Sequence, residues 1–301
     1  MKELRVAAVV VTYNRCELLQ KTLAALEAQT YAPAAIIVVD NASTDDTQHM
    51  LAARDSVSSL QVHRLAENTG GAGGFNAGIK IGYTEGYDAF WVMDDDTAPR
   101  PEALEKLVTT LHDAAEFRGG DMPSYAASMV LWTDGSACEM NFPTPTWDWV
   151  RPVPYQKNWI DIDCASFVSC LVTREAVAHC GFPYKEYFIW FDDAEYTYRL
   201  SKWRPGIFVT DSYVDHLTPE NKGVFWSEVT EANFWKYSRG ARNQVSAGIS
   251  LRKPRILVDL FAGLYRQLRG APVSRKLKLK LTKAAFEGFF QRPRIEYPEQ
   301  K

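Results

Sequence analysis

Two groups of neighbouring carboxylates are the residues of this sequence best suited to chemistry. Asp94, Asp95 and Asp96 follow an apolar run directly, and Asp192 and Asp193 form a second pair. Adjacent carboxylates repel one another unless a cation lies among them. Because hard divalent ions prefer oxygen ligands, the triplet indicates a site for Mg²⁺ or Mn²⁺. The alternative is a solvated acidic loop with one helix-capping aspartate.

The Asp192–Asp193 pair also has two interpretations. It follows an aromatic stretch and begins a helical pattern that carries Glu195. One of the two carboxylates could be a general base that takes a proton from a hydroxyl group. Alternatively, the pair caps the start of the helix, where aspartate is favoured. His216, which follows a strand-like segment, is either a further metal ligand or a structural histidine.

Alternating strand and helix patterns lead up to the aspartate triplet. The strand patterns lie at residues 6–11, 36–39, 61–65 and 89–93, with helical patterns between them. The continuous apolar runs among them are typical of strands buried on both faces of a parallel sheet. This order predicts an α/β fold with a mostly parallel sheet flanked by helices.

Polar residues stand where these strands end, or shortly after. They are Thr12, Asp40, Asn68 and the triplet. Ligands of such sheets bind at the carboxyl ends of the strands, so these residues are predicted to meet at one edge. The glycine-rich run at 70–74 opens a helix but matches neither a dinucleotide fingerprint nor a P-loop. Its backbone is expected to approach a ligand closely.

The remainder of the chain gives coarser predictions. Pro99 and Pro101 are expected to begin a helix. Residues 120–160 are irregular in pattern and rich in Pro, Trp and Asp, and they are expected to form surface strands and loops. Residues 163–173 predict one buried strand followed by a short helix, and the chain beyond residue 227 is predicted to be helical.

Charge is distributed unevenly along the chain. Residues 251–301 contain 13 Lys and Arg against 4 Asp and Glu, whereas the preceding residues contain 21 against 33. A basic tail of this kind indicates contact with an anionic surface, lipid or nucleic acid, or else a solvated helix face. Within it, residues 275–290 predict a basic amphipathic helix that either lies in a membrane interface or packs on the rest of the protein.

Composition excludes several classes of protein. With 46% hydrophobic and 24% charged residues, the chain is predicted to fold as a globular protein. Five cysteines without a CxxC pair predict reduced thiols and exclude a disulfide framework or zinc site. No signal peptide and no membrane-spanning run is predicted. The acidic body and the lack of a binding motif argue against nucleic acid as a partner.

Five ordered motifs resemble those of family-two inverting glycosyltransferases, which have the GT-A fold. They are residues 9–15 (VVVTYNR), 38–45 (VVDNASTD), 68–76 (NTGGAGGFN), 94–96 (DDD) and 190–196 (WFDDAEY). The resemblance covers residues 4–220. The glycine-rich run and the triple aspartate are most similar to bacterial galactofuranosyltransferases, which use UDP-galactofuranose. Rhamnosyltransferases that use dTDP-rhamnose, other hexosyltransferases, sugar-phosphate nucleotidyltransferases and non-catalytic sugar-nucleotide-binding modules remain alternatives.

The resemblance implies a role for each matching residue. The nucleotide sugar would be bound by Thr12, Arg15, Asp40, Asn68, Gly73, Gly74, Asp94 and Asp95. Mg²⁺ or Mn²⁺ would be bound by Asp94, Asp96 and His216. Asp193 would be the catalytic base, with Asp192 beside it at the acceptor and Trp190 in the acceptor platform. The base would take the acceptor proton while the metal holds the diphosphate, and the anomeric configuration would invert.

The resemblance also implies an organisation and a location. Residues 1–226 would form the GT-A domain, with a nucleotide-binding half at about 1–100 and an acceptor half at about 101–226. Residues 227–301 would form a helical, basic C-terminal extension. The acceptor would be a growing, lipid-linked cell-surface glycan, so we expect a cytoplasmic protein held peripherally at the inner face of the cytoplasmic membrane.

Overall fold

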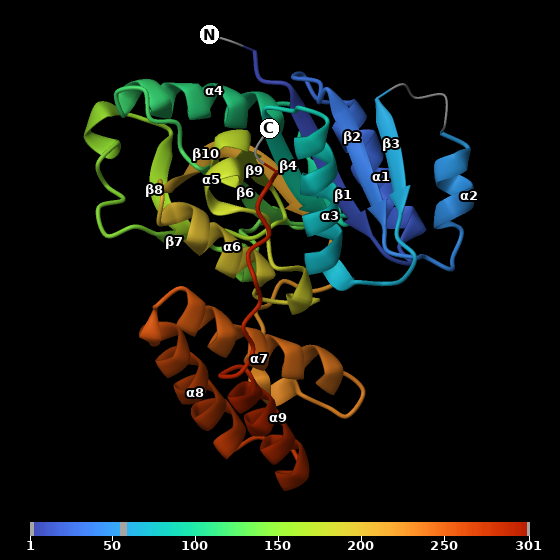
Figure 1. Ribbon diagram of the computed structural model, residues 1–301, viewed down its shortest axis with the longest axis vertical. Helices are drawn as coiled ribbons and strands as arrows, with labels where there is room; N and C mark the ends of the chain where they lie inside the picture. The colour runs from blue at the N-terminus through green and yellow to red at the C-terminus, as the bar shows by residue number, and fades with distance from the viewer. Residues whose placement is uncertain (1–2, 55–58, 300–301) are drawn as a thin grey trace.

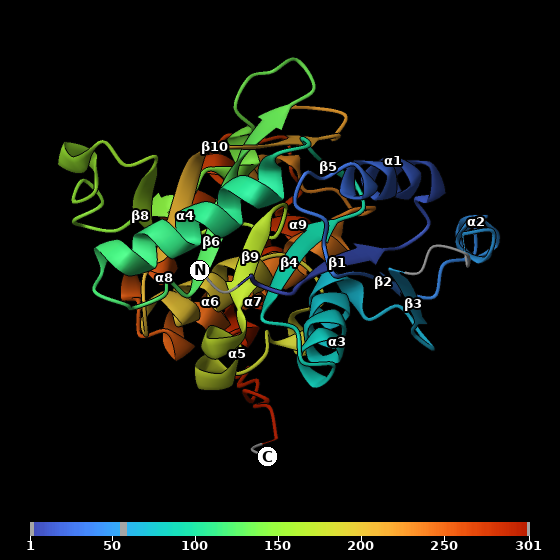
Figure 2. The same cartoon turned by 90° about the horizontal axis from the view of Figure 1, so that it is seen from above.

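The computed structural model describes residues 3–54 and 59–299 and places one mixed sheet between two layers of helices (Figures 1 and 2). The strands are β1 (Val6–Thr12), β2 (Ala35–Asp40), β3 (Leu60–Arg64), β4 (Ala89–Asp94), β5 (Thr97–Pro99), β6 (Tyr125–Trp132), β7 (Thr144–Pro145), β8 (Trp159–Cys164), β9 (Cys170–Thr173) and β10 (Gly206–His216). The helices are α1 (Cys16–Glu27), α2 (Thr47–Ala52), α3 (Gly70–Thr84), α4 (Ala103–Phe117), α5 (Arg174–Cys180), α6 (Asp192–Ser201), α7 (Phe234–Ser250), α8 (Pro254–Arg269) and α9 (Arg275–Glu287).

The sheet has a parallel half and a mixed half. Its strand order is β3-β2-β1-β4-β9-β6-β10-β8-β7, with β5 paired to β10. The first four strands in this order are parallel to one another. Strand β9 is antiparallel to both β4 and β6, whereas β6 and β10 are parallel. The predicted α/β fold with a parallel core is therefore confirmed. The N-terminal strands, whose sequence pattern predicted this fold, form the parallel half.

The continuous apolar sequence of β1 is explained by the helical layers on both faces of the sheet. Val6, Ala8 and Val10 pack in a core that α1, α2 and α4 cover. Ala7 and Val9, which point the opposite way, pack in a second core that α3, α5 and α6 cover. A central strand buried on both faces has no position for a polar side chain until it ends. The first polar side chain on β1 is Thr12, at the carboxyl edge.

Three sequence predictions were wrong. Residues 163–173 are not one strand, because the chain leaves the sheet after β8: the N–H of Ala165 bonds to the Thr197 hydroxyl of α6. The region 120–160 does not form surface strands and loops alone, since its strand β6 lies between β9 and β10 in the sheet interior. Pro99 does not begin a helix; it pairs with Val214 at the end of β5, an edge position that proline tolerates.

Glycines in α3 let this helix lie close to the sheet. Gly74, Gly78 and Gly82 are four residues apart and therefore share one helix face. A Cβ on Gly74 would overlap Val11 of β1, and a Cβ on Gly78 would overlap Val9 of the same strand. The glycine-rich sequence thus sets the distance between helix and sheet.

The three C-terminal helices form a bundle with its own apolar cluster, which includes Leu260, Leu264, Leu277 and Leu281. The bundle lies below the sheet in Figure 1. The chain then returns from α9 toward the sheet, where the carbonyl of Glu296 accepts the N–H of Phe182 at 2.8 Å. None of the helices in the described ranges has both the length and the apolar character that crossing a bilayer requires.

Candidate active site

The carboxyl ends of β1 and β4 open into a cavity of about 750 Å³. The start of α6 and one face of α7 also line this cavity. Ten of the sequence-predicted site residues are among its lining: Thr12, Arg15, Asn68, Asp94, Asp95, Asp96, Trp190, Asp192, Asp193 and His216. Both acidic clusters, which are far apart in the sequence, therefore face the same space.

The aspartate triplet is fixed by neighbours from the end of β1. Asp95 and Asp96 are only 3% and 6% exposed, so the interpretation as a solvated loop was wrong. The Thr12 hydroxyl donates to Oδ2 of Asp95 at 2.7 Å. The guanidinium of Arg15 lies 3.2 Å from Oδ1 of Asp95 and 2.7 Å from Oδ2 of Asp96. One cation from the protein thus neutralises part of the charge.

The three carboxyl groups differ in their affinity for protons. Burial, followed by repulsion from Asp96 and Asp95, raises the pKa of Asp94. Burial also raises the pKa of Asp95 to about 6, against the opposing effect of Arg15. Burial would raise the pKa of Asp96 as well, but His216 and Arg15 outweigh it, and the pKa is lowered. Asp96 is therefore the member of the triplet that holds its negative charge most firmly.

His216 brings a ring nitrogen to Asp96. Its Nδ1 lies 3.0 Å from Oδ1 of Asn141, whose own amide nitrogen donates to the Ser166 hydroxyl at 2.9 Å. An amide oxygen only accepts, so Nδ1 carries the proton in this contact. Nε2 then faces Oδ1 of Asp96 at 3.3 Å. A proton on Nε2 or a metal ion between the two atoms would join them.

A metal ion fits this position. Within the described residues, Oδ1 of Asp96 is buried and has no hydrogen-bond partner. A carboxylate oxygen beside an imidazole nitrogen suits Mn²⁺, and the carboxylates alone suit Mg²⁺. Across residues 3–54 and 59–299, no three His, Cys, Asp or Glu side chains are arranged to hold a metal. Of the predicted ligands, Asp96 and His216 are in contact, and Asp94 lines the same cavity.

The second acidic cluster begins α6. The N-cap of this helix is Phe191, so neither Asp192 nor Asp193 is the capping residue, and the capping interpretation was wrong. Oδ1 of Asp193 accepts the N–H of Ala194 at 2.7 Å. Burial and then repulsion from Asp193 raise the pKa of Asp192 to about 7, and burial also raises the pKa of Asp193. A carboxylate with a raised pKa is a stronger base, as proton abstraction requires.

The turn that leads into α6 has an unusual backbone. Phe188, Trp190 and Phe191 have φ angles of 65°, 64° and 70°. These left-handed conformations cost a residue other than glycine roughly 1–3 kcal/mol each and persist only where surrounding contacts hold them. The strain is therefore located directly before the two aspartates.

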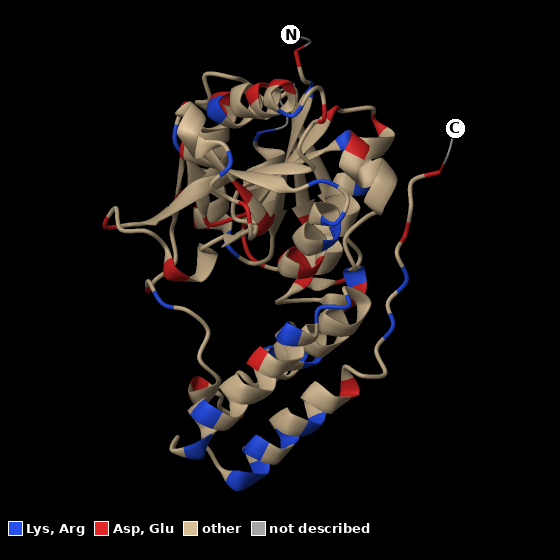
Figure 3. Cartoon of the chain, turned by 90° about the vertical axis from the view of Figure 1, so that its left-hand side faces the viewer, with Lys and Arg blue, Asp and Glu red and all other residues tan. Residues whose placement is uncertain are grey.

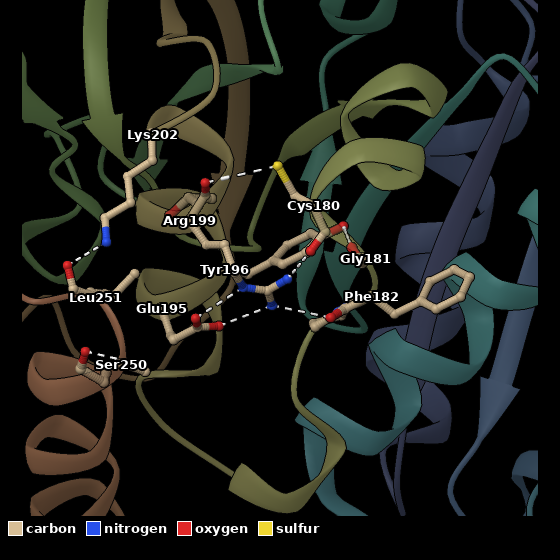
Figure 4. Close-up of polar contacts among 12 residues, drawn as sticks. Cys180, Gly181, Phe182, Glu195, Tyr196, Arg199, Lys202, Ser250 and Leu251 are labelled. Atoms are coloured by element: carbon tan, nitrogen blue, oxygen red, sulfur yellow. Dashed lines mark hydrogen bonds and ion pairs between the residues drawn. The ribbon is translucent and has the colours of Figure 1, made fainter. Parts of the chain in front are cut away.

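Glu195, a further acidic residue of α6, is committed to an ion pair (Figure 4). Its two carboxylate oxygens lie 3.0 and 3.1 Å from Nε and Nη2 of Arg199. Arg199 also donates to the carbonyl groups of Cys180 and Phe182. Glu195 is 1% exposed and is not among the cavity-lining residues of the described chain. It anchors α6 to the loop after α5.

Asp40 lies beside the cavity but faces away from it. Its Oδ2 accepts from Nη1 of Arg64 at 2.6 Å, and its Oδ1 accepts the N–H of Ser43 at 2.9 Å. The side chain is 1% exposed, and among the described residues it is the neighbouring Asn41 that lines the cavity. The structure thus gives Asp40 a role in fixing the loop after β2.

Gly73 and Gly74 are likewise absent from the cavity lining of the described chain, where Gly70 and Gly71 are found instead. A Cβ on Gly73 would overlap the Thr69 side chain. The expectation that the whole glycine run approaches a ligand is therefore supported only for its first two residues. The later glycines approach protein atoms.

Sequence reasoning did not anticipate the wall that α7 contributes. Trp235, Lys236, Gly240 and Gln244 of this helix line the cavity. Nζ of Lys236 lies 4.8 Å from the centre of the Trp190 ring. The helical pattern predicted α7 but not that it would line the cavity. An amphipathic sequence indicates that one face of a helix is buried, but it does not indicate what that face packs against.

A parallel α/β half with carboxylates at its strand ends, facing a second carboxylate pair across a cavity, defines a GT-A-type glycosyltransferase fold. Two solved structures are similar in fold. S. aureus TarS 1–349 in complex with UDP has a TM-score of 0.61 at 15% identity, over 94% of this chain and 80% of that one. GalNAc-T7 with UDP, GalNAc and Mn²⁺ has a TM-score of 0.61 at 15% identity, over 93% and 54%.

The sequence also matches a family profile, described as Glycosyl transferase family 2, over residues 7–165. The chain belongs to this family. Family membership excludes the interpretation as a sugar-phosphate nucleotidyltransferase. The matched range contains the aspartate triplet but ends before Asp192 and His216, so these two residues are placed at the cavity by the fold alone.

Curated relatives are similar over part of the chain. Galactofuranosyltransferase GlfT1 of Mycolicibacterium smegmatis is 38% identical over 108 residues. That segment is 36% of this chain and 35% of the relative. The chain thus matches about a third of the length of this relative.

Proposed function

We propose that this protein is an inverting transferase that moves galactofuranose from UDP-galactofuranose to a hydroxyl group of a glycan. The observation that carries the proposal is that Asp94–Asp96 and Asp192–Asp193 line one cavity. A direct displacement at the anomeric carbon needs a base for the acceptor proton and positive charge for the leaving group. It needs no covalent nucleophile. The pair at the start of α6 suits the first task, and the triplet at the end of β4 suits binding of a metal ion that would supply the positive charge.

The residues at the end of β1 are suited to the donor. Thr12, Asn68 and Asp95 would contact the nucleotide sugar, and the half-exposed guanidinium of Arg15 would reach its diphosphate. On the other side, Asp193 would accept the proton of the attacking hydroxyl. The ring of Trp190 would support the acceptor sugar through its apolar face.

Asp96 and His216 would hold Mn²⁺ or Mg²⁺, with Asp94 as a further candidate ligand. When bound, the cation would supply positive charge against the negative charge that develops on the departing diphosphate. The buried, unpartnered oxygen of Asp96 supports this assignment. The structure of the neighbour GalNAc-T7 contains both UDP and Mn²⁺, which supports the proposal that this protein binds UDP together with a metal ion.

Two observations favour UDP-galactofuranose over other donors. The chain resembles galactofuranosyltransferases in its glycine-rich run and triple aspartate, and GlfT1 is its partial relative. The UDP complex of TarS supports UDP as the nucleotide part of the donor. A dTDP-rhamnose-dependent rhamnosyltransferase is the competing assignment within the family.

Product analysis with several donors tests this assignment. The purified protein would be incubated with a synthetic lipid-linked acceptor and, separately, UDP-galactofuranose, UDP-galactopyranose or dTDP-rhamnose. We expect a product, detected by mass spectrometry, with UDP-galactofuranose alone. Calorimetric titration should show that UDP binds at least about tenfold more tightly than dTDP, a difference of about 1.4 kcal/mol. A product with dTDP-rhamnose and none with UDP-galactofuranose would overturn the donor assignment.

We further propose that the acceptor is a growing, lipid-linked cell-surface glycan and that the protein binds the inner face of the cytoplasmic membrane peripherally. Helix α9 packs on α7, and its Leu277 and Leu281 are buried in the bundle cluster, whereas Leu279, Phe286 and Phe290 remain exposed. Lys and Arg remain exposed along the bundle and at its far end (Figure 3). Arg266, Arg269, Arg275 and Lys276, at the α8–α9 connection, form what we term the basic tip.

A further inference from the structure

We propose that Asn243 of α7 is a positioning residue for catalysis: it holds the turn at residues 187–191 and thereby aims Asp192 and Asp193 into the cavity. The inference rests on the proposed function, since Asn243 would act through the proposed base. Asn243 would then be a residue that turnover requires, on a helix that lies beyond the residues matched by the family profile.

Asn243 contacts the turn at three points. Its side chain is fully buried, and the two hydrogens of Nδ2 are shared among the carbonyls of Tyr187 at 2.9 Å, Ile189 at 3.1 Å and Trp190 at 2.9 Å. The side-chain oxygen is held by Arg242, whose Nη2 donates to it at 3.1 Å. Because the oxygen is engaged, the amide nitrogen is the atom that points at the turn.

The turn depends on such contacts. Trp190 and Phe191 have φ angles near 65–70°, which bulky side chains rarely adopt. Without Asn243, the carbonyl groups of Ile189 and Trp190 would lose this donor, whereas that of Tyr187 would keep the N–H of Ile189. Asp192 follows Phe191 directly, so relaxation of these backbone angles would turn the start of α6 and move both carboxylates together.

Two further contacts support the same turn. Gly240, three residues before Asn243 on the same face of α7, lies against the Trp190 ring; a Cβ there would be 2.6 Å from it. On the opposite side, the N–H of Ala72 in α3 donates to the carbonyl of Phe188 at 3.2 Å. The turn is therefore clamped between α3 and α7, and Asn243 provides the clamp on the α7 side.

The test compares Asn243→Ala with Val245→Ala. Val245 is also fully buried on α7, but it packs in the bundle cluster, so its truncation lowers stability without removing a bond to the turn. With both variants assayed well below their melting temperatures, we expect Asn243→Ala to lower kcat at least tenfold. We expect kcat of Val245→Ala to stay within twofold of the unsubstituted protein. The dissociation constant for UDP should stay within threefold in both variants.

Asn243→Ser, which keeps one hydroxyl donor, should have an intermediate kcat, and it carries the test if Asn243→Ala does not fold. Three results would overturn the proposal. They are normal kcat in Asn243→Ala, equal losses in Asn243→Ala and Val245→Ala, and a weakening of UDP binding that accounts for the whole loss of activity.

Hydrogen exchange separates this inference from the proposed function. If the protein transfers no galactofuranose at all, the proposed donor is wrong, but the claim about the turn can still be tested. Peptides covering residues 187–193 should exchange faster in Asn243→Ala than in Val245→Ala, while peptides of β1 and β4 should be unchanged. Equal exchange at residues 187–193 in both variants would contradict the role of Asn243 whatever the substrate.

Discussion

The carboxylates of the cavity differ at the level of single residues in what surrounds them. Asp96 lies between a guanidinium and an imidazole, whereas Asp193 accepts a backbone N–H at the start of a helix. The first environment stabilises the ionised form and suits a ligand of a cation. The second, being buried, favours proton uptake. Substitutions by asparagine should therefore have different consequences at the two positions.

Asp193→Asn should abolish most transfer while leaving donor binding intact. The amide keeps the size of the side chain but cannot accept the acceptor proton, and general-base assistance typically contributes ~10²–10⁴-fold to rate. We expect kcat to fall by about that factor, with UDP affinity within about threefold by calorimetry. Asp192→Asn is the matched control and should be milder. Near-normal turnover in folded Asp193→Asn would transfer the role of base to Asp192, since Glu195 is held by Arg199.

Asp96→Asn should instead weaken metal-dependent binding of UDP. Removing the charge leaves His216 without its anionic partner and takes one ligand charge from the cation. We expect UDP affinity, measured by calorimetry with Mn²⁺, to fall at least about tenfold, or about 1.4 kcal/mol. In the unsubstituted protein, excess EDTA should stop transfer, and added Mn²⁺ should restore it. Full activity after verified metal removal would exclude a metal from the reaction.

At the level of elements, α3 shows how a glycine-rich sequence serves packing as well as a site. Its first glycines line the cavity, and those farther along let the helix approach β1. Gly71 and Gly78 represent these two environments within one helix. A methyl group on Gly71 would meet only Phe75, at an ordinary 3.8 Å, whereas on Gly78 it would overlap Val9.

Gly78→Ala and Gly71→Ala should therefore have opposite effects on stability. Alanine in a helix gains ~1 kcal/mol over glycine. At position 78 overpacking against β1 should exceed this gain, because inserted methyl groups in a tight core typically cost about 1–3 kcal/mol. We expect a lower midpoint of urea unfolding for Gly78→Ala, and an equal or higher one for Gly71→Ala. A Gly78→Ala protein as stable as Gly71→Ala would show that the helix moves away from the sheet at little cost.

The parts of the site that could be predicted from sequence are those fixed by topology. Thr12 and the triplet end parallel strands, so they must share one edge of the sheet whatever their side chains contact. Other parts depend on contacts that no local pattern records. The pairing of Asp40 with Arg64, the covering of Trp190 by Gly240 and the placement of β6 inside the sheet all arise from tertiary packing.

At the level of the whole molecule, the C-terminal part of the chain, which includes α8 and α9, is rich in Lys and Arg, whereas the rest of the chain has more acidic than basic residues. The basic tip lies at the far end of α8 and α9, away from the sheet (Figure 3). Each Lys or Arg close to an anionic bilayer contributes about 1 kcal/mol to binding. We expect the protein to sediment with phosphatidylglycerol vesicles and less so as salt rises. Replacing the four residues of the basic tip by glutamate should abolish sedimentation.

Substitution is a better test of membrane binding than truncation after Gly270. Truncation would remove α9, which packs on α7, and also the contact between Glu296 and Phe182. Arg151→Glu combined with Lys157→Glu, on a loop of the sheet half, is a control of the same kind of charge change and should leave sedimentation unaltered. If the basic-tip variant sedimented as before, the charge on the bundle would be only a solvated surface.

The wall of the cavity is assembled from residues between Val11 and Gln244, which has a consequence for how the protein is made. Contacts between distant parts of a chain form slowly, and the N-terminal part of a protein is synthesised first. During translation, β1 and β4 with the aspartate triplet would therefore emerge from the ribosome well before His216 and α7 are synthesised. A chain whose translation stalled before α7 would carry every recognisable motif and yet have no closed cavity. Its sheet would have all its strands, but the uncovered cavity would depend on chaperones until α7 was made.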